Sequence, residues 1–127
     1  MKTKFFLPFV LLVFVLLAAC GGSSESGQAE ASIGDATAGK TKFESTCIAC
    51  HGVDAKGLPN LGKDLTTSEF VRTTADLDLV AFVMKGRPPF DPANTTGVDM
   101  PPKGGNPALT EEDIKDIISY VRTLQAK

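Results

Sequence analysis

Hydrophobic residues recur every three or four positions near the end of the chain, which is the spacing of one face of an α-helix. This stripe consists of Ile114, Ile117, Ile118, Val121 and Leu124. Thr110 stands just before three acidic residues, an arrangement typical of an N-cap and a first turn that suits the helix dipole. The pattern therefore predicts a helix that begins after Thr110 and runs to about Gln125.

A second helix is predicted over Asp76–Lys85. It offers four hydrophobic side chains for burial, those of Leu79, Val80, Phe82 and Val83. We expect Thr73 or Thr74 to cap its start, and Gly86 stands where a glycine commonly ends a helix.

The other regular structure is also predicted to be helical. One helix runs from about Ala38 to Cys47, and a short helical turn fits Ser68 to Arg72. No stretch alternates hydrophobic and polar residues in the manner of a β-strand. We therefore expect an all-α domain of three to four helices over residues 36–127.

A long irregular segment separates the last two predicted helices. Arg87 to Leu109 holds six prolines and three glycines in 23 residues. Loops of this length within a small domain are usually functional or disordered. We predict that this one is functional.

The start of the chain is typical of an export signal. Lys2 and Lys4 precede an apolar run of 15 residues from Phe5 to Ala19. Such a run reaches roughly 22 Å as a helix, short of the roughly 30 Å core of a bilayer. We therefore predict a signal peptide over residues 1–19 and an exported protein.

Leu17-Ala18-Ala19-Cys20 resembles the lipobox of bacterial lipoproteins. The resemblance implies cleavage before Cys20, a lipid on its sulfur and attachment to the cell or outer membrane. An ordinary cleaved signal and an uncleaved anchor are the alternatives. The residues that follow, up to Asp35, are rich in glycine and serine, so we predict that residues 20–35 form a flexible linker.

The composition narrows the class of protein. The 127 residues include 43% hydrophobic and 22% charged positions, with 13 Lys+Arg against 15 Asp+Glu and a formal net charge of −2. These values argue against a disordered chain, a membrane protein with several spans and a basic nucleic-acid binder. The chain has three cysteines and one histidine, so a metal site with two histidines from one chain is excluded.

Cys47-Ile48-Ala49-Cys50-His51 carries the chemistry of the chain. On a helical turn, Cys47 and Cys50 share a face, and His51 follows directly. Two thiols can therefore attach to one side of a flat ligand while the imidazole reaches its centre. This is the attachment signature of c-type haem, and export is consistent with it. A Cys47–Cys50 disulfide, a zinc site and a chance occurrence are the alternatives; zinc would lack a fourth ligand.

A haem iron bound to His51 needs a second axial ligand if it is to transfer electrons without binding small molecules. The candidates are Met84, which lies in a predicted helix where a core role is common, and Met100. Pro101 and Pro102 stiffen the chain beside Met100. We predict that Met100 is the ligand; an open or lysine-filled position is the alternative. A thioether ligand raises the reduction potential relative to two histidines.

Together these motifs resemble the class I single-haem cytochromes c, close to the short bacterial group that includes the cytochrome c5-like proteins. The resemblance spans about Gly39 to Leu124. It rests on Gly39, Phe43, the Cys47–Gly52 motif, Gly57-Leu58-Pro59, Gly97–Pro102, Gly104–Pro107 and the helix with Tyr120.

The resemblance implies a small cytochrome c fold around one covalently attached haem c. It also implies that the first and last helices cross, with Gly39 allowing close approach near Phe43 and Tyr120. Pro59 would accept a hydrogen bond on its backbone carbonyl from Nδ1–H of His51. A plain turn residue is the alternative for Pro59.

The sequence thus predicts a membrane-tethered carrier of single electrons, and not an enzyme, with redox proteins as donor and acceptor. One alternative is a dedicated subunit of a larger oxidase, quinol-oxidising complex or dehydrogenase. Another is a haem-based sensor or peroxidase, against which the lack of a second histidine counts. The basic residues Lys56, Lys63, Arg87 and Lys103 suggest a positive haem edge for docking, with an ordinary solvated surface as the alternative.

Overall fold

The computed structural model describes residues 32–125. The predicted signal peptide, the predicted lipidation site Cys20 and most of the predicted linker lie outside this range. Within it, no helix combines the length and the apolar character needed to cross a membrane.

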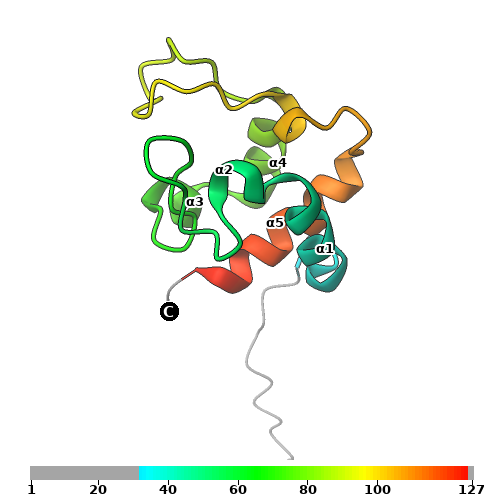
Figure 1. Cartoon of the computed structure of the whole chain (residues 1–127). Helices are drawn as coiled ribbons and strands as arrows, with labels where there is room; N and C mark the ends of the chain where they lie inside the picture. The colour runs from blue at the N-terminus through cyan, green and yellow to red at the C-terminus, as the bar shows by residue number, and fades with distance from the viewer. Residues whose placement is uncertain (1–31, 126–127) are drawn as a thin grey trace, which may run out of the picture.

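The described chain is helical, as predicted. Its helices are α1 (Ala36–Thr46), α2 (Ile48–His51), α3 (Glu69–Thr73), α4 (Asp76–Lys85) and α5 (Glu111–Leu124), with a 3₁₀ turn at Pro102–Gly105. Residues 32–125 contain no β-strand, only an isolated bridge between Arg87 and Met100. The all-α prediction is confirmed, and two of the five helices are short connecting turns (Figure 1).

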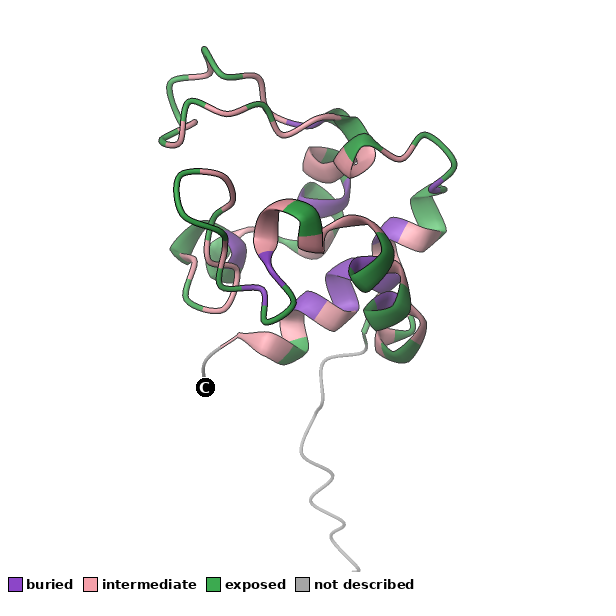
Figure 2. Cartoon of the chain, in the orientation of Figure 1, coloured by how far each residue is buried: buried purple, intermediate pink, exposed green. Residues whose placement is uncertain are grey.

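Helices α1 and α5 cross at the base of the molecule (Figure 1). A Cβ atom on Gly39 would collide with the backbone carbonyl of Asp116, so only glycine permits this approach. Phe43 is 1% exposed and meets Tyr120 edge to face, with ring centroids 5.5 Å apart. The crossing expected at these residues is confirmed, and the buried residues gather around it (Figure 2).

The start of α5 has the predicted cap. The Thr110 hydroxyl accepts a hydrogen bond from Asp113 N at 3.2 Å, and the Asp113 carboxylate accepts one from Thr110 N at 2.8 Å. This reciprocal pair satisfies two backbone donors that the helix leaves unpaired. From there the hydrophobic stripe runs through the core along α5.

Helix α4 has the predicted bounds but not the predicted cap. Its N-cap is Ala75, which offers no side-chain hydrogen bond, whereas Thr73 donates to the Glu69 carbonyl within α3. Arg122 of α5 fills the corner between α3 and α4, where it donates to Asp76 Oδ1 at 2.7 Å and to two carbonyls. The prediction that Thr73 or Thr74 caps α4 is therefore wrong, because Arg122 stabilises this corner instead. Gly86 ends α4 with a φ of +74°, as predicted.

The folded domain begins before the predicted boundary at residue 36. Ile33 packs against the core, and Asp35 caps α1 by accepting hydrogen bonds from Thr37 N and Ala38 N. Its own N–H donates to Asp116 Oδ1 at 2.7 Å. The expectation that the linker extends to residue 35 is therefore wrong for residues 32–35. Ile33 is the aliphatic side chain that holds this segment against the domain, and Asp116 of α5 supplies the hydrogen-bond acceptor.

Candidate functional site

A cavity of about 460 Å³ lies between the helices and the long loop. This volume falls within the range usual for small-molecule and cofactor sites. The two predicted attachment side chains, Cys47 and Cys50, and the two predicted iron ligands, His51 and Met100, all line it. Most other lining residues are hydrophobic, and many of these come from α3, α4 and α5. The fold therefore brings together groups that are up to 53 positions apart in sequence, from Cys47 to Met100.

The two cysteines and the histidine sit on one helical turn. Cys47 ends α1, since its N–H donates to the Phe43 carbonyl at 2.8 Å, and its own carbonyl accepts from His51 N at 3.0 Å. The turn is thus a direct continuation of the helix that crosses α5. This placement gives the thiols and the imidazole a rigid support.

Burial raises the pKa of the Cys47 thiol to about 11, and the neighbouring Cys50 sulfur adds a smaller contribution in the same direction. The Cys47 thiol therefore stays protonated at neutral pH. Its half-buried position points to a group held in the cavity and not to an exposed reactive thiolate.

The imidazole of His51 is oriented by a backbone carbonyl, but by a different one from that expected. Its Nδ1 lies 2.9 Å from the carbonyl oxygen of Lys63. The expectation that Pro59 supplies this carbonyl is therefore wrong. With Nδ1 engaged as a donor, Nε2 is the nitrogen left to bind a metal.

The path of the chain after His51 explains why Lys63, and not Pro59, supplies this carbonyl. Leu58 accepts hydrogen bonds from Leu61 N and Gly62 N, which turns the chain sharply and leaves Pro59 exposed on the outside. Gly62 then passes so close to the Cys50 carbonyl that a Cβ atom there would collide with it. The residue that follows, Lys63, consequently meets the imidazole.

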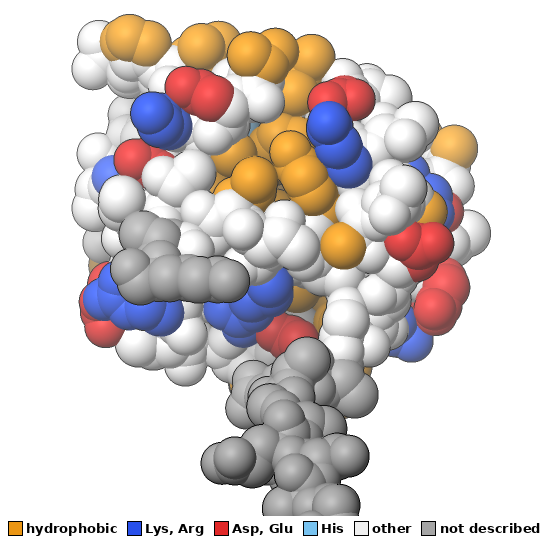
Figure 3. Space-filling view, turned by 90° about the horizontal axis from the view of Figure 1, so that it is seen from below, with side chains coloured by type: hydrophobic (Ala, Val, Ile, Leu, Met, Phe, Trp, Pro, Cys, Tyr) orange, Lys and Arg blue, Asp and Glu red, His pale blue; other side chains and the backbone are white. Residues whose placement is uncertain are grey.

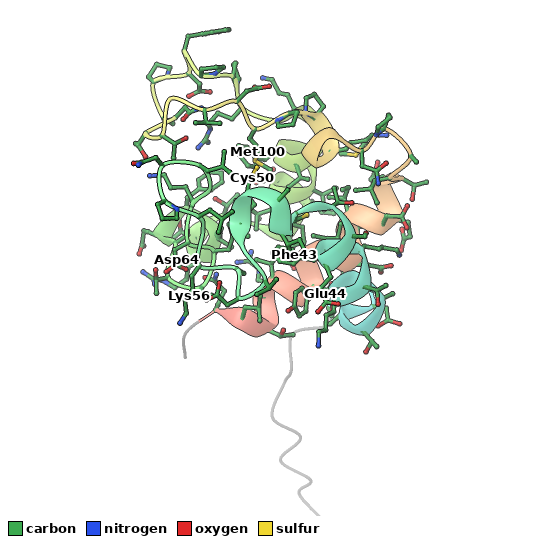
Figure 4. The ribbon with its side chains drawn as sticks, viewed as in Figure 1. Phe43, Glu44, Cys50, Lys56, Asp64 and Met100 are labelled. Atoms are coloured by element: carbon green, nitrogen blue, oxygen red, sulfur yellow. The ribbon has the colours of Figure 1, made fainter. Side chains whose placement is uncertain are left out.

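Met100 reaches the cavity from the long loop. It pairs with Arg87 through two backbone hydrogen bonds, Arg87 N to Met100 O at 2.8 Å and Met100 N to Arg87 O at 2.9 Å. Figure 4 labels Met100 and Cys50 near the middle of the molecule, and both line the cavity. Met84 packs against the core instead and is not among the residues that line the cavity.

The charged residues around the cavity are mixed in sign. Lys63, Arg87 and Lys103 line it, but so do Asp64 and Asp99, and Lys56 does not. The Arg87 guanidinium lies over the rings of Phe82 and Phe70, 4.6 and 4.9 Å from their centroids. Figure 3 likewise shows basic and acidic side chains on both sides of a hydrophobic centre on one face. A uniformly positive edge therefore stays a prediction.

Two features of this site could not be predicted from the sequence. The Lys63 carbonyl carries no sequence signal, because every residue has a backbone carbonyl. The stacking of Arg87 on Phe82 and Phe70 joins residues 5 and 17 positions away, and no local pattern indicates it.

The donor set fits one flat, largely apolar group that carries a metal at its centre. Two neighbouring thiols can attach it covalently, an imidazole with a fixed orientation can bind the metal, and a thioether offers a further soft ligand. Within residues 32–125, no cluster of three or more His, Cys, Asp or Glu side chains offers an alternative metal site. The cavity therefore fits haem better than a zinc ion.

Comparisons with known proteins agree with this chemistry. The family described as Cytochrome c matches residues 36–125. The chain is 31% identical over 87 residues to cytochrome c-555 of Chlorobaculum thiosulfatiphilum, covering 68% of this chain and 93% of that protein. It is 34% identical over 96 residues to cytochrome c-554(547) of Halothiobacillus neapolitanus, covering 72% of this chain and 99% of that protein.

A larger protein is also similar. Subunit CcoP of the cbb3-type cytochrome c oxidase of Rhodobacter capsulatus is 33% identical over 90 residues, which cover 70% of this chain but only 29% of that subunit. The chain thus spans less than a third of this relative. No solved structure matches the chain.

Proposed function

Since this chain belongs to the cytochrome c family, we propose that it carries single electrons between redox complexes outside the cytoplasm, tethered to a membrane by a lipid on Cys20. The family makes it an electron-transfer protein with covalently bound haem c. The observation that carries the proposal is the shared cavity of Cys47, Cys50, His51 and Met100. The tether rests on the sequence of residues 1–20 alone.

Different residues of the cavity would hold different parts of the haem. Cys47 and Cys50 would attach it through thioethers, and His51 would bind the iron through Nε2 because Lys63 engages Nδ1. Met100 would complete the coordination with its sulfur. When bound, haem supplies the one-electron chemistry.

The hydrophobic part of the cavity wall would keep water away from the bound group. Leu79, Ile114 and Ile117 are buried and line the cavity, so the group would sit in an apolar, poorly hydrated environment. Such an environment, together with a thioether ligand, favours the reduced state of the iron and a higher potential. A closed coordination sphere favours electron transfer over reaction with small molecules.

The similarity to CcoP favours a second candidate, a haem subunit of a terminal oxidase or a related complex. Extraction of the native membrane with mild detergent distinguishes this subunit from the mobile carrier. Recovery in a large complex would support the subunit, whereas recovery as a free lipoprotein would support the mobile carrier.

The proposed ligand set is tested by visible spectra of the purified haem-loaded protein and of Met100→Ala, oxidised and reduced. We expect a c-type α-band in both, and a weak far-red band of methionine-bound ferric iron in the wild type only. A wild type without that band, or a variant that retains it, would remove Met100 from the ligand set. Mass spectrometry of the native protein tests the lipid: a mass that ends at Cys20 with acyl chains is expected.

A further inference from the structure

The loop that carries Met100 is held together differently from the rest of the domain. No residue from Arg87 to Met100 is buried by other parts of the protein, although Asn94 and Val98, among others, line the cavity that would hold haem. At its base, Arg87 and Met100 pair through two backbone hydrogen bonds. Beyond this pair, Pro88 and Pro89 have no N–H to donate across the loop. Another group must connect the two arms.

The side chain of Asn94 makes this connection. Its amide nitrogen donates to the Pro88 carbonyl at 3.1 Å on one arm and to the Val98 carbonyl at 2.7 Å on the other. Pro88 directly follows Arg87, and Val98 lies two residues before Met100. The amide group therefore joins the arms just beyond the point where Met100 is paired.

The oxygen of the same side chain organises the tip of the loop. It accepts hydrogen bonds from Thr96 N at 3.1 Å, Thr96 Oγ1 at 3.0 Å and Gly97 N at 3.0 Å. Asn94 thus uses both its donors and its acceptor within the loop. The acceptor half shapes a local turn, as asparagine often does, whereas the donor half spans the loop.

We propose that Asn94 is the positioning residue for Met100, and that its amide group keeps the loop closed so that the Met100 sulfur stays at the iron. The inference rests on the proposed function, because it presumes that Met100 is an iron ligand. Asn94 lines the cavity, but its amide nitrogen donates to the Pro88 and Val98 carbonyls, so it acts on Met100 through the backbone of the loop. Its loss opens the loop locally while α1 and α5 remain folded.

The size of the effect follows from the two bridging hydrogen bonds. A neutral hydrogen bond contributes modestly to stability, and two of them change the closed-to-open ratio of the loop by roughly 10- to 100-fold. In the reduced protein, carbon monoxide binds only when Met100 has left the iron. Its binding rate therefore reports the open fraction directly.

The experiment compares haem-loaded full-length wild type with Asn94→Ala, Asn94→Asp, Asn106→Ala and Met100→Ala. Asn94→Asp retains the acceptor oxygen but places a second oxygen against the Pro88 and Val98 carbonyls. Asn106→Ala is the matched control, because Asn106 lies beyond the Arg87–Met100 pair, where it donates to Thr46 Oγ1 and accepts from Ala108 N. Each variant is measured by far-red absorbance on heating, by carbon monoxide binding and by helical circular dichroism.

We expect both Asn94 variants to bind carbon monoxide about 10- to 100-fold faster than the wild type. Their far-red band should vanish well below the temperature at which helical structure is lost. Asn106→Ala should lose its band only together with its helices. Asn94→Asp keeps the experiment decisive if Asn94→Ala does not fold.

Three results would overturn the inference. Wild-type carbon monoxide rates in both Asn94 variants would show that the amide does not hold Met100. Equal acceleration in Asn106→Ala would show a general loss of stability in place of positioning. If the wild type lacks the far-red band, or Met100→Ala keeps it, the ligand assignment in the proposed function fails first, and the role of Asn94 fails with it.

Discussion

The α1–α5 crossing and the loop from Arg87 to Met100 support opposite ends of the proposed ligand set by different physical means. At the crossing, Gly39 brings two backbones together and Phe43 is buried against Tyr120. Cys47 continues directly from this helix. The thiols and the imidazole are therefore fixed by apolar packing that belongs to the core of the domain. This packing is lost only when the domain itself unfolds.

In the loop, no residue from Arg87 to Met100 is buried, and hydrogen bonds from Asn94 supply the connections. These bonds are only partly buried, so water can compete for them, and we expect this part of the molecule to open at a lower free energy than the helices. We therefore expect the attachment side of the site to be as stable as the domain, and the Met100 side to have its own, lower stability. Four pairs of substitutions outside the proposed ligand set test this difference.

The largest effect is expected at the crossing itself. In Gly39→Ala the new methyl group meets the Asp116 backbone, which cannot move without separating the helices. We expect a loss of about 4 kcal/mol or more in the free energy of unfolding. Denaturant titration followed by circular dichroism measures it.

Gly97→Ala is the matched change in the loop. A Cβ atom there meets nothing within 4 Å, and only the φ of +70° opposes it. The cost should be roughly 1–2 kcal/mol. Equal losses in the two alanine variants would contradict the close approach of α1 to α5.

Truncation of a large side chain should also separate the two regions. Ile114 is 0% exposed, so Ile114→Ala should cost about 3 kcal/mol through lost burial and a residual cavity. Phe90 at the loop is 87% exposed, and Phe90→Ala should stay within about 0.5 kcal/mol. Thermal and denaturant unfolding of the haem-loaded variants measure both. A large loss in Phe90→Ala would mean that the loop is packed in a way the described residues do not show.

A smaller effect, graded with pH, is expected at Lys42, which bridges α1 to Asp113 and Asp116 of α5 at 2.9 and 2.5 Å. Hydrogen bonds from Lys42 hold the pKa values of both carboxyls below their usual range, with backbone groups adding to the effect. Unfolded, these carboxyls titrate near pH 3.9. The ion pairs therefore stabilise the fold above about pH 4, and this stability is lost as the pH falls through the folded pKa values.

Lys42→Met should reduce stability at pH 7 and flatten the fall in unfolding free energy between about pH 4 and pH 2. Denaturant titrations across this range measure the slope. Lys40→Met is the control, because among residues 32–125 Lys40 pairs only with the exposed Glu44, at 3.8 Å. An unchanged slope in Lys42→Met would place the acid sensitivity elsewhere.

The smallest effect is expected at Arg87. Arg87→Lys keeps the charge and the backbone pair with Met100 but loses the flat guanidinium over Phe70 and Phe82. We expect a loss of about 0.5–1 kcal/mol in the unfolding free energy. Arg72→Lys, in an exposed pair with Glu69, is the control and should be near neutral. Equal losses in both variants would remove the stacking as a contribution.

Local sequence determined much of this protein. The bounds of α4, the N-cap of α5 and the helical turn of Cys47, Cys50 and His51 follow from spacings of three and four residues, which fix contacts within one helix. The crossing at Gly39 followed from resemblance to a family, not from spacing. Met100 was preferred to Met84 because two prolines follow it and stiffen the chain. In the structure Met100 lines the cavity, whereas Met84 does not.

The tertiary structure decided the contacts between distant segments. Whether Pro59 or Lys63 turns its carbonyl to His51 depends on where the chain bends at Leu58 and Gly62, and backbone carbonyls carry no residue identity. Arg122 replaced the expected threonine caps of α4 because α5 packs beside that corner. Spacing in sequence fixes what lies one helical turn away, whereas contacts across loops depend on the path of the whole chain.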